Sequence, residues 1–255
     1  YKTAFRKMKE ALCDIDDISE EEKYQIANLY SDYARLYLDV GDVSGSIEKY
    51  KETIEKYGES KVSPESPWRF TTYTNYANAL VLNKDWITAN NYAFQALIGK
   101  YTIYEKPNYA IANVLLVLGN IYKNEKQLWD IADVFYKKAL KIFRKELHPD
   151  KFCNTLAGLA IVEQNTQYAL QAYRILKTEA KKCDVNTYIN VMEALILDRP
   201  KEVLDLGERV LMQYMEEENV SSRQYLYALM GKAGYLLNKI EIMETYLDKA
   251  YEMED

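Results

Sequence analysis

The chain has 255 residues, long enough to bury a substantial core, and only nine Gly and five Pro among many strong helix formers, so its composition favours helices. Its formal net charge of −6 argues against direct nucleic-acid binding by this segment, because gripping a phosphate backbone requires clustered Lys and Arg. No run of about 18 apolar residues and no signal-peptide core occur, so we expect a protein that does not span a membrane and acts in the cytoplasm.

The cysteines do not form a pattern that would bind a metal. Cys13, Cys153 and Cys183 lie far apart in the sequence, and His148 is the one histidine that could assist them. Zinc sites and disulfide frameworks need closely spaced or paired cysteines. We therefore expect no metal site, no cofactor and no disulfide framework, and we interpret the thiols as small buried side chains in a reducing cytosol.

The opening residues, 1–18, are interpreted as the second helix of an incomplete leading repeat. Ala4, Met8 and Ala11 fall on one face of that helix. Residues 19–255 are then predicted to form a repeat domain.

A repeat of aromatic and small residues begins in the segment 30–53, where Gly41 supplies a turn between two helices. The small residues Ser46, Ala89 and Ala132 are 43 residues apart, more than the roughly 34 of a standard helical-hairpin unit, which predicts helices longer by about two turns. The frame returns along the whole chain, and the predicted units are approximately 19–60, 66–105, 107–146, 149–181, 184–218 and 221–253.

Prolines mark where several helices are predicted to begin. Ser66 precedes Pro67, and Pro107, Pro149 and Pro200 fall between successive units. Proline is favoured in the first helical turn, because its missing N–H would have no partner there in any case. We therefore expect new helices to begin at or just after these positions.

The sequence resembles the tetratricopeptide repeat (TPR) superfamily over nearly its whole length. The best single match is Leu118 to Tyr122, with the sequence LGNIY. The resemblance implies an all-α fold, a right-handed superhelical stack of about six TPR-like helical hairpins (an α-solenoid), whose first helices line a concave groove. It also implies that the chain binds a protein or peptide.

A narrower resemblance comes from the extended units in an acidic chain rich in Lys, Ile, Tyr and Asn. These features are similar to the C-terminal sensor domains of peptide-pheromone (quorum-sensing) transcriptional regulators of Gram-positive bacteria. In that family a helix-turn-helix usually precedes the repeats, and this sequence contains no such motif. The resemblance therefore implies a separate DNA-binding domain outside this segment.

Amide and basic side chains recur at the first-helix positions that face the groove in the standard frame. An Asn amide can donate to a peptide carbonyl and accept from a peptide N–H at once, and Arg or Lys can bind an acidic side chain or a terminal carboxylate. The predicted peptide-binding residues are Asn28, Arg35, Thr74, Asn78, Asn113, Asn120, Lys123, Asn154, Asn190 and Lys232.

A structural interpretation of these amides stays open. Asn at such positions also satisfies polar groups of the neighbouring hairpin, so Asn78 or Asn120 taken singly does not decide between packing and binding. Most of the 24 tyrosines are assigned to the repeat core, with Tyr225 and Tyr235 expected on the inner face of the last unit.

Two functions remain in view, and neither is enzymatic, because no nucleophile or acid–base set accompanies His148, which we place in an inter-repeat turn. The first is the peptide-sensing half of a bacterial transcriptional regulator, which binds a short linear peptide. The alternative is a constitutive TPR adaptor that docks a protein partner without switching. Apolar residues near the C-terminal repeats, including Leu236, Ile240 and Met243, predict a homodimer through those repeats.

Overall fold

The computed structural model describes residues 20–59, 66–179, 183–214 and 220–253, together with residues 3, 6–8 and 10. All regular elements in these residues are helices and none is a strand, which confirms the predicted all-α class. The predicted lone second helix over 1–18 lies outside the described residues, apart from the few helical positions just given.

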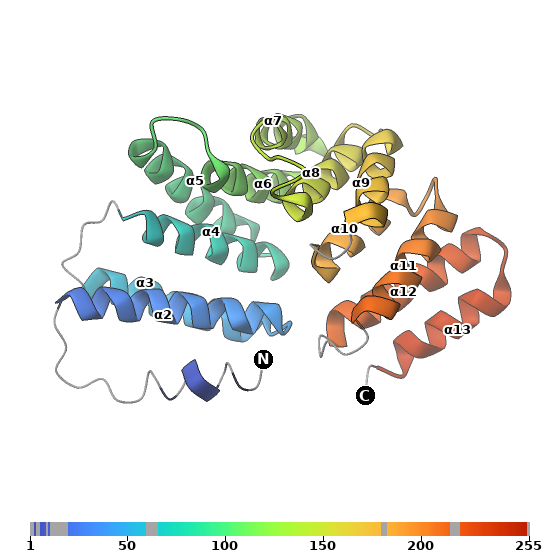
Figure 1. Ribbon diagram of the computed structural model, residues 1–255, viewed down its shortest axis with the longest axis horizontal. Helices are drawn as coiled ribbons and strands as arrows, with labels where there is room; N and C mark the ends of the chain where they lie inside the picture. Colours follow the sequence, from blue (N-terminus) through green and yellow to red (C-terminus); the bar gives the residue numbers. More distant parts are fainter. Residues whose placement is uncertain are drawn as a thin grey trace. The chain divides into compact units, whose positions relative to one another are not determined.

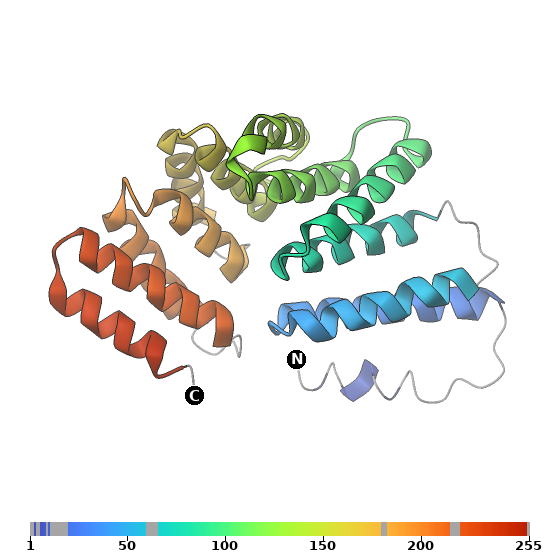
Figure 2. The ribbon, with the colours of Figure 1, turned by 180° about the vertical axis from the view of Figure 1, so that it is seen from behind.

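The helices follow one another as hairpins joined by short turns (Figure 1, Figure 2). In chain order they are α2 (Glu20–Asp39) and α3 (Val43–Glu59), α4 (Pro67–Leu82) and α5 (Trp86–Ile103), α6 (Tyr109–Lys123), the 3₁₀ helix η1 (Lys126–Leu128) and α7 (Trp129–Leu140), α8 (Pro149–Val162) and α9 (Thr166–Glu179), α10 (Val185–Leu195) and α11 (Pro200–Tyr214), and α12 (Val220–Leu236) and α13 (Ile240–Tyr251).

The chain divides into two compact units, Tyr1–Ile121 and Tyr122–Asp255, called unit 1 and unit 2 below. In unit 1, α2 packs on α3, α4 packs on α5, and both helices of the first hairpin contact α4. In unit 2, α8 packs on α9, α10 on α11 and α12 on α13, and α10 also contacts α8 and α12. The first helices α8, α10 and α12 are therefore consecutive neighbours, and one apolar core runs from Cys153 in α8 to Ala233 in α12.

The helices of unit 1 are long, as the spacing of the small residues predicted. The helices α2 to α5 have 16 to 20 residues, whereas α8 to α11 have 11 to 15. In α6 and α7, with 15 and 12 residues, the longer repeat comes instead from the connections around them, which include η1. Extra length in this repeat therefore has two sources, long helices and long connections.

Three of the four predicted proline starts are confirmed directly. The helices α4, α8 and α11 begin at Pro67, Pro149 and Pro200. Pro107 lies shortly before α6, where the Asn108 side chain accepts a hydrogen bond from Ile111 N at 3.2 Å and so caps the helix.

Four hairpin turns share one backbone geometry. Each has a residue with positive φ at the second position after the first helix: Gly41 (88°), Lys84 (61°), Gln164 (51°) and Asn238 (55°). In the first turn, Asp42 N donates to Tyr37 O at 2.9 Å and Gly41 N donates to Leu38 O at 3.0 Å, and the same pair of bonds recurs in the other three. This is the Schellman arrangement, which satisfies the last carbonyls of a helix.

This geometry predicts the effect of glycine at the third of these turns. A side chain at positive φ costs about 1–2 kcal/mol, which glycine avoids at some loss of chain entropy, so Gln164→Gly should raise the free energy of unfolding by about 0.5–1 kcal/mol. Gln171→Gly, in the exposed middle of α9, is the control and should lower it by a similar amount. Urea unfolding measures both, and a loss of stability in Gln164→Gly would contradict this view of the turn.

Candidate binding surface on the first helices

Two of the predicted groove residues are joined across neighbouring first helices of unit 2. The amide nitrogen of Asn190 in α10 donates to Asn154 Oδ1 in α8 at 2.8 Å, and the Asn154 amide nitrogen donates to Thr187 Oγ1 at 3.0 Å. The Thr187 hydroxyl in turn donates to Asp184 Oδ1 at 3.0 Å. The three hydrogen bonds therefore run in one direction and end at the Asp184 carboxylate, which also caps α10 by accepting from Thr187 N.

A second set of polar contacts joins α10 to α12. The Ser222 hydroxyl donates to Asn186 Oδ1 at 3.3 Å, and the Tyr225 hydroxyl donates to a Glu193 carboxylate oxygen. Asn186, Asn190 and Glu193 are spaced by four and three residues, which places them on one face of α10. That face therefore makes polar contacts with both neighbouring first helices.

These residues form a continuous polar strip over three consecutive first helices, which we call the polar seam. Its members are Asn154 in α8, Asn186, Thr187, Asn190 and Glu193 in α10, and Ser222 and Tyr225 in α12.

Lys123 is the last residue of α6 and belongs to unit 2. It is a half-buried cation, close enough to Glu193 of the polar seam to interact with it electrostatically. Burial lowers the pKa of the Lys123 ammonium, and the negative charge of Glu193 acts in the opposite direction. Among the described residues its side-chain nitrogen makes no hydrogen bond or ion pair. The described part of the fold thus holds a partly desolvated positive charge whose donors it does not use.

In unit 1, Asn28 has a structural bond. The hydroxyl of the fully buried Tyr57 donates to Asn28 Oδ1 at 2.6 Å, so this amide oxygen helps to join α2 to α3. Burial raises the pKa of Tyr57 to about 12, which keeps the hydroxyl protonated and able to donate. Beside it, the hydroxyls of Ser31 and Thr72 lie 2.8 Å apart and join α2 to α4.

The prediction of Thr74 as a surface contact is wrong. Its side chain is 1% exposed and its hydroxyl accepts a hydrogen bond from Lys100 Nζ at 2.9 Å. Lys100, itself 2% exposed, also donates to Ala110 O at 3.3 Å. Thr74 therefore helps to solvate a buried lysine inside unit 1, and it cannot meet a ligand.

The other predicted residues lie at or near the surface. Arg35 and Lys232 are exposed, whereas Asn78, Asn113 and Asn120 are half-buried on α4 and α6. Tyr225 and Tyr235, expected on the last unit's inner face, are 45% and 67% exposed.

Sequence reasoning missed Glu193, Thr187 and Lys100. Glu193 carried a usable signal, because it follows Asn190 by three residues and so shares its helix face. Thr187 and Lys100 carried none: a threonine in the first turn of a helix and a lysine in the last are ordinary at exposed positions. Only the packing shows that both are buried.

The interpretation of the cysteines as buried side chains is confirmed for Cys153 and Cys183, whereas Cys13 lies outside the described residues. Across the described ranges, no group of three or more His, Cys, Asp or Glu residues is placed to hold a metal ion. Nor is any helix in that part of the chain long and apolar enough to cross a membrane. His148 is half-buried directly before α8, with its ring 6.1 Å from that of Phe143.

No protein-family model matches the chain, and no curated protein matches it. Among solved structures it is similar to BtubC (BKLC) from P. vanneervenii, with a TM-score of 0.51 and 16% identity over 93% of this chain and 92% of that chain. A putative kinesin light chain from Podosopora anserina, with nearly identical TPR-like repeats, has a TM-score of 0.45 and 14% identity over 88% of this chain in each of two structures, covering 93% and 92% of theirs. The similarity to BtubC supports the fold of consecutive helical hairpins.

The buried Lys100 predicts a specific pH dependence of stability. Desolvation lowers its pKa from 10.5 to about 8, so the unfolded chain holds this proton more tightly than the folded one. The cost, about 3 kcal/mol by linkage, is fully present below pH 8 and disappears as the pH rises to 10.5. Lys100→Met should therefore stabilise the protein at pH 7 and lose that advantage by pH 10.5, as measured by urea unfolding at both values.

Lys106→Met, at an exposed position of the same unit, is the control and should change stability little at either pH. Replacing Lys100 should leave no unpaired group, because the Thr74 hydroxyl also donates to Phe70 O and Ala110 O can accept the ordinary helical bond. A Lys100→Met protein that is less stable than the parent at pH 7 would contradict this account.

Proposed function

We propose that this chain binds protein or peptide ligands through its first helices, and that the ligand is a short linear peptide laid across α8, α10 and α12. The observation that carries this proposal is the polar seam, which brings amide, hydroxyl and carboxylate groups together on three neighbouring helices. An extended peptide needs both donors and acceptors along its length, and these groups offer both.

The dimensions fit a short ligand. An extended chain advances about 3.3 Å per residue, and packed helices are about 8–10 Å apart, so each helix corresponds to about three peptide residues. A peptide that crosses α8, α10 and α12 therefore needs only about seven to ten residues.

Lys123 supplies the charge preference. A half-buried ammonium without a bonded acceptor among the described residues can gain from a carboxylate on the ligand. Glu193 lies near this cation and would discourage a second acidic group beside it. We therefore propose a ligand with one carboxylate, on an acidic side chain or at its C-terminus.

The finer proposal is that the chain is the peptide-sensing half of a cytoplasmic bacterial transcriptional regulator. The bond between Asn190 and Asn154 ties α10 to α8. A peptide that takes over one of these amides would favour a different spacing of the two helices. Such a difference in affinity between two arrangements is what a ligand needs in order to shift their populations.

A constitutive adaptor is the second candidate, and the bond between Asn190 and Asn154 also supports this alternative. The amides of Asn154 and Asn190 are already bonded to one another, so α8 and α10 are held together in the absence of a ligand. In that case the surface would dock a protein partner at fixed helix spacing.

The proposal predicts that Lys123→Met weakens peptide binding without weakening the fold. Linear peptides selected from a random phage-displayed library on the purified protein should bind the variant about tenfold less tightly, since a charge-assisted contact is lost. Its melting temperature should stay the same or rise, because removal of a partly buried charge removes a desolvation cost. Binding is measured by calorimetry and stability by thermal unfolding.

Lys201→Met, an exposed lysine at the start of α11, is the matched control and should change neither quantity. Amidation of the selected peptide's C-terminus shows whether that carboxylate or an acidic side chain is bound. If no peptide is selected, or if Lys123→Met binds as tightly as the parent chain, peptide binding at this surface is ruled out.

A further inference from the structure

The outer face of α5 exposes apolar side chains and no charge. Its exposed residues follow one stripe along the helix and are Ile87, Asn91, Gln95, Ile98, Tyr101 and Thr102. Ile87 is 88% exposed, Ile98 is 66% exposed and Tyr101 is 49% exposed. The one charged residue of α5, Lys100, is buried within unit 1. An uncharged face of this kind is typical of the centre of a protein interface.

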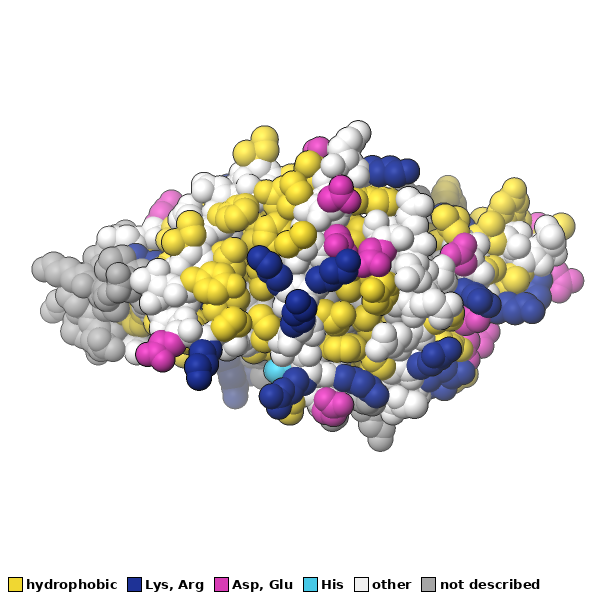
Figure 3. All heavy atoms as spheres, turned by 90° about the horizontal axis from the view of Figure 1, so that it is seen from above, with side chains coloured by type: hydrophobic (Ala, Val, Ile, Leu, Met, Phe, Trp, Pro, Cys, Tyr) yellow, Lys and Arg dark blue, Asp and Glu magenta, His cyan; other side chains and the backbone are white. Residues whose placement is uncertain are grey.

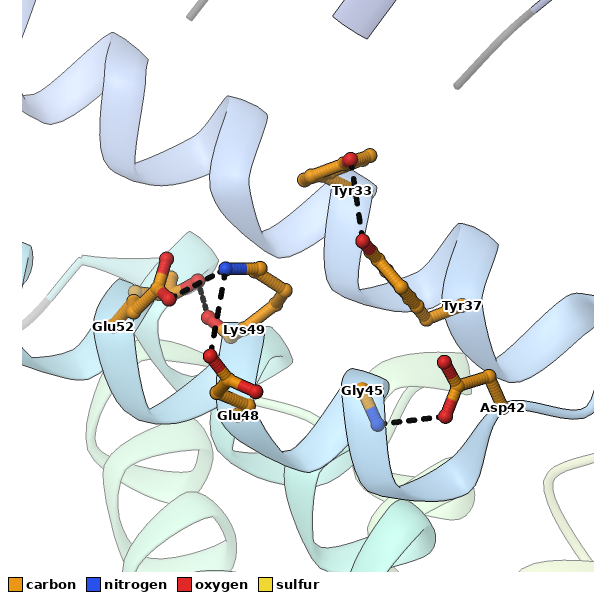
Figure 4. Close-up of polar contacts among 8 residues, drawn as sticks. Tyr33, Tyr37, Asp42, Gly45, Glu48, Lys49 and Glu52 are labelled. Carbon is orange, nitrogen blue, oxygen red and sulfur yellow. Dashed lines mark hydrogen bonds and ion pairs between the residues drawn. The ribbon is translucent and has the colours of Figure 1, made fainter. Parts of the chain in front are cut away.

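The neighbouring second helix shows that this composition is not a property of the fold. In α3 the exposed positions include Glu48, Lys51 and Glu55. Figure 4 shows Lys49 of the same helix paired with Glu52, at 2.5 Å, and near Glu48. The outer face of α3 is therefore charged and suited to contact with water, whereas the outer face of α5 is not.

The polar groups on the α5 face already have partners. Gln95 Nε2 donates to Asn91 Oδ1 at 3.1 Å, and the Thr102 hydroxyl donates to Ile98 O at 3.0 Å. Burial of a polar group is costly mainly when its hydrogen bonds are lost. Covering this face therefore costs less than covering an ordinary helix surface.

Further exposed apolar residues lie on the helices next to α5. Trp68 and Leu82, near the two ends of α4, are 62% and 54% exposed, and Tyr109 at the start of α6 is 43% exposed. Figure 3, seen from above Figure 1, shows hydrophobic side chains gathered over the part of unit 1 that contains α5.

We propose that the outer face of α5 binds the same face of a second copy of this chain, with the two α5 helices antiparallel across a two-fold axis. Such an axis brings identical residues together, so a charged face would oppose like charges. The chain carries a net charge of −6, yet this face carries none, and it can meet its own copy without repulsion. Antiparallel pairing about Gln95 brings Ile87 of one copy to the Tyr101 and Thr102 end of the other, and places Ile98 beside the other copy's Asn91.

The C-terminal repeats, from which the sequence predicted a homodimer, fit this role less well. The last helix, α13, does expose Ile240, Leu247 and Tyr251. Acidic residues alternate with them, and Glu244 and Asp248 are exposed on the same helix. Lys249 is exposed on this helix too, so a two-fold contact there would bury charged side chains of both signs, a desolvation cost that α5 avoids.

The area of the α5 face determines how tightly the two copies are expected to associate. The stripe covers about 22 Å of helix at about 1.5 Å per residue, and a stable interface usually needs about 800 Å² from each partner. One helix face of this length, about 10 Å wide, offers only about 200–300 Å², which is smaller than that. The dimer is therefore weak and depends on protein concentration, and because the face is uncharged its stability changes little with salt.

The test compares two isoleucines of almost equal exposure, Ile98 at 66% and Ile240 at 63%, by analytical ultracentrifugation over a range of protein concentrations. Ile98→Glu should raise the dimer dissociation constant by at least about tenfold, because it buries unpaired charges at the interface. Ile240→Glu should leave the constant unchanged. Both variants should melt at the parental temperature, because both positions are exposed.

A cysteine pair gives the positive counterpart. Under mild oxidation Gln95→Cys should form a disulfide-linked dimer, since position 95 lies at the axis, whereas Glu48→Cys on the outer face of α3 should form no disulfide-linked dimer. The proposal is overturned if the parent chain is monomeric at every concentration. It is equally overturned if Ile240→Glu, and not Ile98→Glu, breaks the dimer.

Discussion

Close packing of helical hairpins through small side chains is the constraint on which the rest of this structure depends. Alanines such as Ala89, Ala132 and Ala172 are completely buried, and an added Cβ at Gly158 would lie 2.4 Å from the ring of Tyr136. Helices that approach this closely must use one face for each neighbour and leave the remaining face for solvent or for a ligand. The polar seam on the first helices and the uncharged stripe on α5 are two such remaining faces.

The polar seam serves the fold and the proposed site with the same atoms. The bond from Asn190 to Asn154 stabilises the contact of α10 with α8, and both amides keep further bonding capacity for a ligand. Removal of such an amide would change packing and binding together, which is why its role is hard to isolate. Lys123 is different, because burial of its charge costs the fold more than the attraction of Glu193 returns, and it therefore separates the two roles.

The all-α hairpin class and the helix starts at Pro67, Pro149 and Pro200 could be predicted, because they rest on short-range patterns: alternation of small and aromatic residues, and proline in first turns. The bonding of the candidate site could not. Whether Thr74 faces a groove or a buried lysine depends on how deeply Lys100 is packed, and no spacing within α4 reveals that. Once Asn190 had been chosen, helical periodicity could have predicted Glu193 on the same face of α10. The bond of Glu193 to Tyr225 could not be predicted, because it depends on the packing of α12 beside α10.

The central claim, that the first helices of unit 2 hold a short linear peptide, is tested most directly by native mass spectrometry of the protein purified from the cells that make it. The account predicts a complex whose extra mass corresponds to one peptide of about seven to ten residues, the length that crosses three packed helices. Collisional activation should release that peptide intact, since nothing covalent holds it. A bare chain, or one that carries only a large folded protein, would contradict the peptide claim and favour the adaptor.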